Sequence, residues 1–230
     1  MMRTEKFAQV VLQEPAHWSY FGDGASTLNW RDLGRAAARG HIHIMKWLNT
    51  HRRSPGWSIE TMDIAAANGH LAVVKWLHYN RFEGCTAVAM NLAAANGHLP
   101  VIQWLHVHRS EGCTGSAVNE ASRNGHLHVV QWLYANRWGD CKKGTNQSTV
   151  MELAAQNGHQ ALVIWLLKNS PKCAQRYEGC HPRAMDLAAE HGHLSVVQLF
   201  HSNRLEMIRK KSIRLEMIRK KSIRLEMIRK

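Results

Sequence analysis

The side chains best suited to chemistry in this chain are its histidines, because an imidazole binds metals and exchanges protons near neutral pH. Six of them follow a glycine at intervals of 28 to 34 residues: Gly40-His41, Gly69-His70, Gly97-His98, Gly125-His126, Gly158-His159 and Gly192-His193. A zinc site brings its ligands to about 2 Å from one ion, whereas a residue that recurs once per repeat is spread along an axis. The spacing therefore favours a structural role, in which each ring nitrogen bonds carbonyl oxygens of the turns between helices.

A metal bound through one close pair of histidines is the alternative, and the candidate pairs are His41-x-His43, His106-x-His108 and His191-x-His193. The cysteines offer no such site, since four recur once per repeat (Cys85, Cys113, Cys141 and Cys180) and Cys173 is out of register. Thiols one repeat apart lie roughly 10 Å from each other by the spacing of packed helices, and a disulfide needs Cα atoms closer than about 7 Å. We therefore expect reduced thiols in a reducing compartment.

Patterns typical of enzymes are missing from the sequence. It has no glycine-rich phosphate loop, no Gly-x-Ser-x-Gly nucleophile elbow and no paired-cysteine zinc motif. Carboxylates placed one repeat apart do not form a general acid–base pair. We therefore expect a non-catalytic protein with no metal, no cofactor and no small-molecule substrate.

The elements that would position these residues are two short helices joined by a glycine turn. In the unit from Cys85 to Gly112, Thr86 is a good N-cap for an alanine-rich helix. Asn96-Gly97 ends that helix, because Gly97 can adopt a positive φ. A second helix follows, with an apolar stripe at helical spacing that comprises Leu99, Val101, Ile102 and Leu105. The period predicts stacked antiparallel helix pairs, each burying its apolar face against its neighbours.

These units resemble the ankyrin repeat family in the run Met-x-Leu-Ala-Ala-x-Asn-Gly-His-Leu-x-Val-Val. A more specific similarity is to short ankyrin units abundant in water moulds, carried by Trp76-Leu77-His78 with Glu83-Gly84-Cys85-Thr86 and by Trp104-Leu105-His106 with Glu111-Gly112-Cys113-Thr114. The resemblance covers about residues 35–203 and implies an all-α, ankyrin-like repeat solenoid. The 28-residue units are about five residues shorter than the usual period of about 33. Because the missing residues fall where the family projects a β-hairpin finger, we expect shortened or absent fingers.

Three parts are expected along the chain: an N-terminal cap over residues 1–34, six ankyrin-type repeats over 35–203 and a basic tail over 204–230. The formal net charge is +13, and the tail holds 11 Lys/Arg and 3 Glu, which leaves it +8. The tail repeats a decapeptide, and ten residues at roughly 100° each fall about 80° short of three turns. Its apolar residues therefore spiral around a helix. The tail is either a solvated basic helix or disordered extension, or a segment for nucleic acid, anionic membrane or nuclear import.

Residues at one position of each repeat form columns. A core role is favoured over base stacking for the tryptophans of the second helices: Trp47, Trp76, Trp104, Trp132 and Trp165. The arginines after the second helices suit the negative end of the helix dipole, or alternatively a grip on acidic peptides or phosphates: Arg52, Arg81, Arg109, Arg137 and Arg204. The candidate partner-binding residues are polar side chains of the first helices: Asp63, Asn91, Asn119, Arg123, Glu152, Gln156 and Asp186.

The sequence thus predicts a non-catalytic scaffold that binds a protein partner through the first helices and loops of its repeats. The alternative is a binder of nucleic acid or anionic lipid that acts through the basic tail. We expect a monomer in the cytoplasm, with the nucleus as the location that the tail would favour instead. The sequence shows neither a run of 18 apolar residues nor the pattern of a secretory leader, so we do not expect a membrane-spanning or secreted protein.

Overall fold

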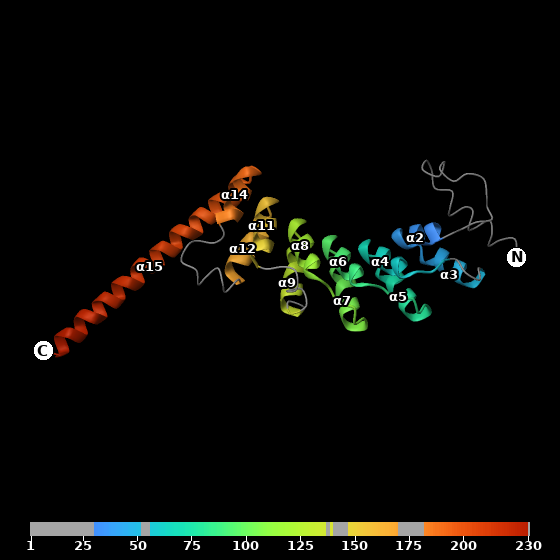
Figure 1. The fold of residues 1–230 in the computed structure, drawn as a ribbon, viewed down its shortest axis with the longest axis horizontal. Helices are drawn as coiled ribbons and strands as arrows, with labels where there is room; N and C mark the ends of the chain where they lie inside the picture. The colour runs from blue at the N-terminus through green and yellow to red at the C-terminus, as the bar shows by residue number, and fades with distance from the viewer. Residues whose placement is uncertain (1–29, 52–55, 137–138, 140–146, 170–181, 230) are drawn as a thin grey trace. The chain divides into compact units, whose positions relative to one another are not determined.

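The computed structural model describes residues 30–51, 56–136, 139, 147–169 and 182–229, which are helical apart from short turns and loops (Figure 1). The helices are α2 (Trp30–Ala38), α3 (Ile42–His51), α4 (Ile59–Ala67), α5 (Leu71–Asn80), α6 (Ala87–Ala95), α7 (Leu99–His108), α8 (Gly115–Arg123), α9 (Leu127–Asn136), α11 (Gln147–Gln156), α12 (Gln160–Asn169), α14 (Pro182–Glu190) and α15 (Leu194–Arg229). No strand occurs within the described ranges. The all-α prediction is confirmed, and the loop from residue 81 to residue 86 contains no β-hairpin finger.

Each repeat before the sixth is an antiparallel pair of short helices joined by a tight turn, as α6 and α7 illustrate. Gly97 adopts a φ of +79°. The His98 N–H donates to the Ala93 carbonyl at 2.8 Å, and the Gly97 N–H donates to that of Ala94 at 3.2 Å. This pair of bonds is the Schellman arrangement, which requires a left-handed residue at the position of the glycine. The turn predicted from Asn96-Gly97 is therefore present.

The core lies between the two helices of each repeat and their neighbours. Small residues of the first helix, such as Ala89 and Ala93, are buried, and so are larger aliphatic residues of the second, such as Val101, Ile102 and Leu105. Alanine allows the helices to approach closely, while the branched side chains fill the space between them. Of the apolar stripe predicted for this second helix, Val101, Ile102 and Leu105 are buried, and Leu99 is half-buried.

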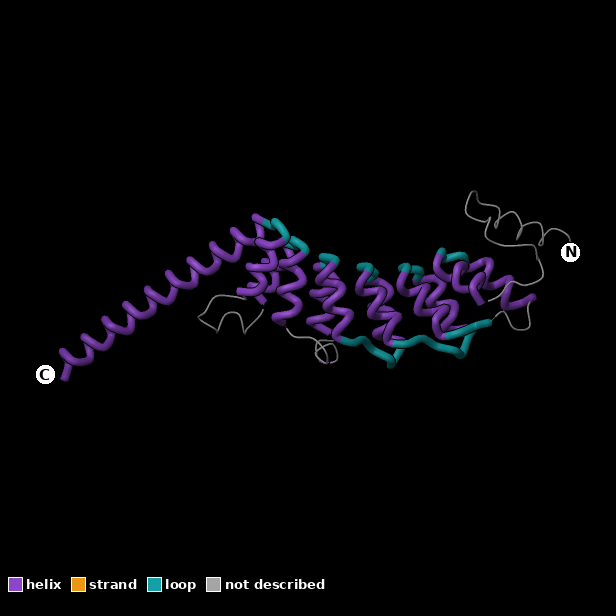
Figure 2. Tube along the Cα trace, turned by 45° about the horizontal axis from the view of Figure 1, so that its top comes forward, coloured by secondary structure: helices purple, strands orange, loops and turns teal. Residues whose placement is uncertain are grey.

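The described helices group into two units, one within residues 1–93 and 98–112 and the other within 94–97 and 113–230. In the first unit α2 lies against α4, and α5 lies against α3 and α7. In the second unit α8 lies against α11, α11 against α14, and α15 against both α14 and α12. The tube in Figure 2 shows the helices of each unit side by side. Within each unit the first helices of consecutive repeats are therefore neighbours.

The tryptophans of the second helices lie at the edge of the core. Trp104 is 9% exposed, but the other four of the column are half-buried. The expectation that all five rings are sealed inside the core is therefore met only by Trp104. At Trp104 and Trp47 a histidine four residues later stacks on the indole, with ring centroids 4.4 and 4.7 Å apart. Positions i and i+4 share a helix face, so the imidazole covers part of the indole surface that the core does not bury.

Several predicted features fall outside the described residues. These are most of the N-terminal cap and the side chains of Cys141, Cys173, Cys180, Arg52 and Arg137. At the other end, α15 continues without a break from repeat six into the basic tail. Among the described helices none is both long enough and apolar enough to cross a membrane.

Candidate functional site

The repeated Gly-His pairs join each repeat to the one before it. The Nε2 atoms of His70, His159 and His193 lie 2.8, 2.7 and 3.0 Å from the carbonyl oxygens of Ala38, Arg123 and Gln156. Because a carbonyl oxygen only accepts, Nε2 must carry the proton and donate it. Each acceptor is the last residue of a first helix, where carbonyls lack a partner within the helix. The hydrogen-bonding role predicted for these histidines is confirmed.

The glycine of each pair makes room for the next histidine. A Cβ atom at Gly69 would lie 2.6 Å from the Nδ1 atom of His98, and one at Gly125 would lie 2.5 Å from that of His159. These glycines therefore satisfy two demands, a positive φ and close approach of an imidazole from the following repeat. Burial is the main cause that lowers the pKa of His98, so its ring is neutral at pH 7. Among the described residues no group of three or more His, Cys, Asp or Glu could hold a metal ion.

Asp63 has a different role from the one expected of a surface residue. Its carboxylate oxygens accept hydrogen bonds from the backbone N–H of Thr86 at 2.9 Å and from the Thr86 hydroxyl at 2.6 Å. The Thr86 Oγ1 atom in turn accepts from the N–H of Val88 at 3.1 Å, as an N-cap does. With only 6% of its surface exposed, Asp63 fixes the start of α6 from the preceding repeat.

The arginines after α5 and α7 are held by glutamates two residues later. Arg109 and Glu111 form an ion pair, and the Nε atom of Arg81 donates to Glu83 at 3.2 Å. All four side chains are half-buried. Arg109 also lies beside the buried Cys85 thiol, whose pKa is raised to about 11, chiefly by burial. These pairs neutralise the arginines locally, so the column offers no row of unpaired cations at these two repeats.

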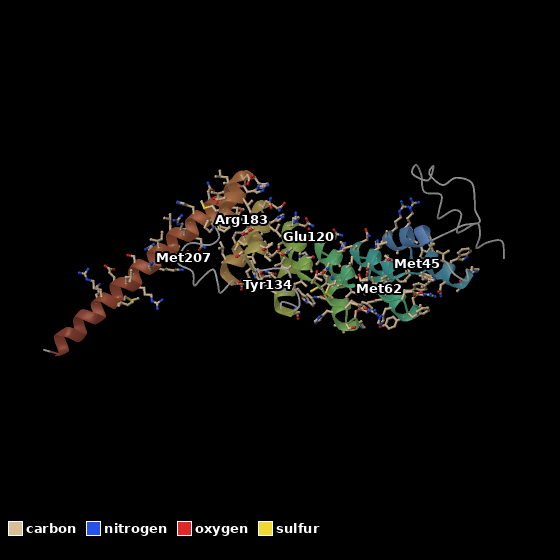
Figure 3. The ribbon with its side chains drawn as sticks, in the orientation of Figure 1. Met45, Met62, Glu120, Tyr134, Arg183 and Met207 are labelled. Atoms are coloured by element: carbon tan, nitrogen blue, oxygen red, sulfur yellow. The ribbon has the colours of Figure 1, made fainter. Side chains whose placement is uncertain are left out.

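Several polar side chains of the second unit lie on three neighbouring first helices, α8, α11 and α14. Arg123 forms an ion pair with Glu120 on α8, with Nε and Oε2 3.2 Å apart. Between helices, Glu152 of α11 lies 3.6 Å from Arg183 of α14. The Nε2 atoms of Gln156 and His191 are 3.3 Å apart. Figure 3 labels Glu120 and Arg183 on the helices that flank α11.

The structure thus brings together five of the seven candidate residues on one side of the second unit. Arg123 and Asp186 are exposed there, while Asn119, Glu152 and Gln156 are half-buried. The other two, Asp63 and Asn91, belong to the first unit and are buried and half-buried. Glu120, Arg183 and Glu190 lie on the same three helices, and His191 directly follows α14, but all four were absent from the sequence-based set. They lie five, nine, two and one residues before the glycine of their own repeat, respectively. This spacing is the signal that could have found them.

These features define a class of protein: a helical-repeat protein that offers a side-chain surface on adjoining helices. A family profile described as ankyrin repeats (3 copies) matches residues 90–177 and 118–211, and a second, ankyrin repeats (many copies), matches residues 62–106. Among solved structures, the human ASB11 ankyrin repeat domain is similar, with a TM-score of 0.53 and 18% sequence identity over 74% of this chain and 82% of that one. No curated protein matches the sequence significantly.

The chain belongs to the ankyrin repeat family. Ankyrin repeats are generally protein–protein interaction modules, and proteins built from them are typically non-catalytic scaffolds. The similarity to the ASB11 domain, at 18% identity, concerns the fold alone.

Proposed function

We propose that this chain binds a protein partner through the surface formed by α8, α11 and α14, here called the unit-two surface. Its residues are Asn119, Glu120, Arg123, Glu152, Gln156, Arg183, Asp186, Glu190 and His191. The observation that carries the proposal is the continuity of this surface: three adjacent helices present polar side chains, and two pairs of these side chains connect α11 with α14 and the residue that follows it.

The charges of this surface indicate the chemistry of the partner. Two arginines face four carboxylates (Glu120, Glu152, Asp186 and Glu190), which gives a net charge of −2. Exposed ion pairs contribute little to the stability of the free protein, so these side chains are available to exchange partners on binding. A rigid scaffold also loses little conformational entropy when it binds. We therefore expect a partner that presents basic side chains to this surface.

The test compares partner capture by two variants of the full chain, each of which carries two new lysines. The double variant Glu152→Lys, Asp186→Lys reverses charge on the unit-two surface. The control variant Ala161→Lys, Gln198→Lys adds two lysines at exposed positions of second helices in the same unit. Proteins captured by the wild type and by the control, but lost with the surface variant, are the partners that the proposal predicts. If every captured protein is retained by both variants, the unit-two surface is not the binding site.

The compartment remains a prediction. An intracellular location is the one expected from the sequence, and imaging of a tagged chain tests it. The monomeric state is likewise expected and is tested by light scattering.

A further inference from the structure

The second helix of repeat six does not end where those of earlier repeats end. Helices α5 and α7 are ten residues long, whereas α15 has 36 residues and runs from Leu194 to Arg229 (Figure 1). From residue 204 to residue 220 its side chains are exposed, except that Met207 is half-buried. At 1.5 Å per residue the helical segment 204–229, here called the tail helix, is about 39 Å long.

The tail helix carries far more cations than its own carboxylates can neutralise. Each full decapeptide contains four Lys/Arg and one Glu. The glutamate of the first decapeptide is engaged locally, because Glu206 and Lys210 form an ion pair at 2.6 Å across one helical turn. The hydrogen bond from Lys210, together with the charge of that lysine, lowers the pKa of Glu206, so it stays ionised. The segment therefore keeps an excess of three positive charges for about every 15 Å of helix.

The cations are distributed all around the tail helix. At roughly 100° per residue, Arg209, Lys210 and Lys211 already cover about 200°. The next cluster begins at Arg219 and is rotated by about 80° relative to the first, because ten residues fall short of three turns. The apolar residues follow the same rotation, and the exposed ones include Leu205, Ile208, Leu215 and Ile218. The tail helix has neither a basic face nor an apolar face.

This distribution excludes two common binding partners of a helix, a membrane surface and a second helix in a coiled coil. A helix that binds in the plane of a membrane needs one continuous apolar face, and a coiled coil needs an apolar seam that stays on one side. A flat anionic surface would also meet only about half of the cations at once. A flexible polyanion can instead bend around the helix and follow the clusters.

We propose that the tail helix binds single-stranded nucleic acid through its phosphates. The arginines of the segment have planar guanidinium groups that pair with phosphate and can stack on unpaired bases. The segment has no aromatic side chain, so binding rests on charge and is independent of base sequence. This site lies apart from the unit-two surface, so either proposal can fail without the other.

The experiment measures anisotropy of a fluorescent oligothymidylate of about 20 nucleotides with the full chain. For five to eight phosphates neutralised, a slope of about −0.7 per phosphate predicts a loss of affinity of about one hundred- to two thousand-fold between 50 and 200 mM salt. A variant with Gln at the six clustered cations loses the binding and keeps its helical circular dichroism. Its substitutions are Arg209→Gln, Lys210→Gln, Lys211→Gln, Arg219→Gln, Lys220→Gln and Lys221→Gln.

Two further probes test the geometry. Vesicles of phosphatidylcholine with roughly one third phosphatidylserine should bind the chain more weakly than the oligonucleotide does, when the two probes are compared at the same concentration of negative charge. A tail of the same composition, rearranged so that cations and apolar residues occupy opposite faces, should gain vesicle binding. The proposal is overturned if the oligonucleotide does not bind at low salt, or if the Gln variant binds it as well as the wild type does. It is also overturned if the chain binds vesicles, or a duplex of the same length, more tightly than the single strand.

Discussion

In the Gly-His pairs, the glycine of one repeat makes room for the histidine of the next, a contact here called the interlock. Replacing Gly125 by alanine tests the interlock most directly. Gly125 and Gly192 share the same φ of +75°, but their surroundings differ. A Cβ at Gly125 would lie 2.5 Å from the imidazole of His159, whereas no atom of the described structure lies within 4 Å of one at Gly192. The pair Gly125→Ala and Gly192→Ala therefore separates the cost of the backbone conformation from the cost of displacing the histidine.

The expected magnitudes follow from these two environments. A left-handed conformation costs a non-glycine residue about 1–2 kcal/mol, and both variants incur this cost. Gly125→Ala also displaces His159, whose hydrogen bond to the Arg123 carbonyl contributes about 0.5–1.5 kcal/mol. Forcing a group into this packed contact adds about 1–3 kcal/mol. We expect Gly125→Ala to lower the free energy of unfolding by about 2–4 kcal/mol more than Gly192→Ala does.

The assay is urea unfolding followed by far-ultraviolet circular dichroism. The decisive control is the His159→Ala background, where the obstructing ring is gone. There Gly125→Ala should cost only the backbone contribution of about 1–2 kcal/mol. Equal costs for Gly125→Ala and Gly192→Ala in the wild-type background would refute the interlock. So would a cost of Gly125→Ala that is as large in the His159→Ala background as in the wild type.

Three further predictions concern single side chains. Asp63→Ala leaves Thr86 without its acceptor and should lower the free energy of unfolding by about 1.5–3 kcal/mol, measured in urea. Trp104→Ala should cost about 3–5 kcal/mol because a buried indole is lost, seen as a lower thermal midpoint. The pKa of His98 is lowered by burial from 6.5, so its contribution to stability is present above about pH 6.5 and is lost as the pH falls through the folded pKa. The urea midpoint should therefore fall less between pH 7.5 and 5.5, roughly one unit on either side of 6.5, in His98→Gln than in the wild type.

Each of these has a clear contrary result. An Asp63→Ala variant as stable as the wild type would mean that the carboxylate does not fix the start of α6. An unchanged thermal midpoint for Trp104→Ala would place that indole outside the core. A wild type and a His98→Gln variant with the same pH dependence would show that the ring titrates alike in the folded and unfolded chains.

The helices and their turns could be predicted from the sequence because they depend on local interactions. Alanine-rich runs, an Asn-Gly stop and an apolar stripe act within about 25 residues, and each recurs in successive repeats. The ring nitrogens were also expected to bond turn carbonyls, and they do. What the sequence left open was the acceptor, because Ala38, Arg123 and Gln156 belong to the repeat before the histidine that binds them.

The candidate surface depended on contacts between repeats, and here the sequence was a weaker guide. Asp63 and Asp186 occupy the same position of their repeats, yet Asp63 is buried under Thr86 and Asp186 is exposed. The difference arises because Asp63 meets a hydrogen-bond donor at the start of the following repeat. By itself the sequence determined the period, the helices and the basic tail, since each follows from neighbours along the chain. Only the tertiary structure decided which polar side chains hold repeats together and which stay exposed, because that choice is made by residues about one repeat away.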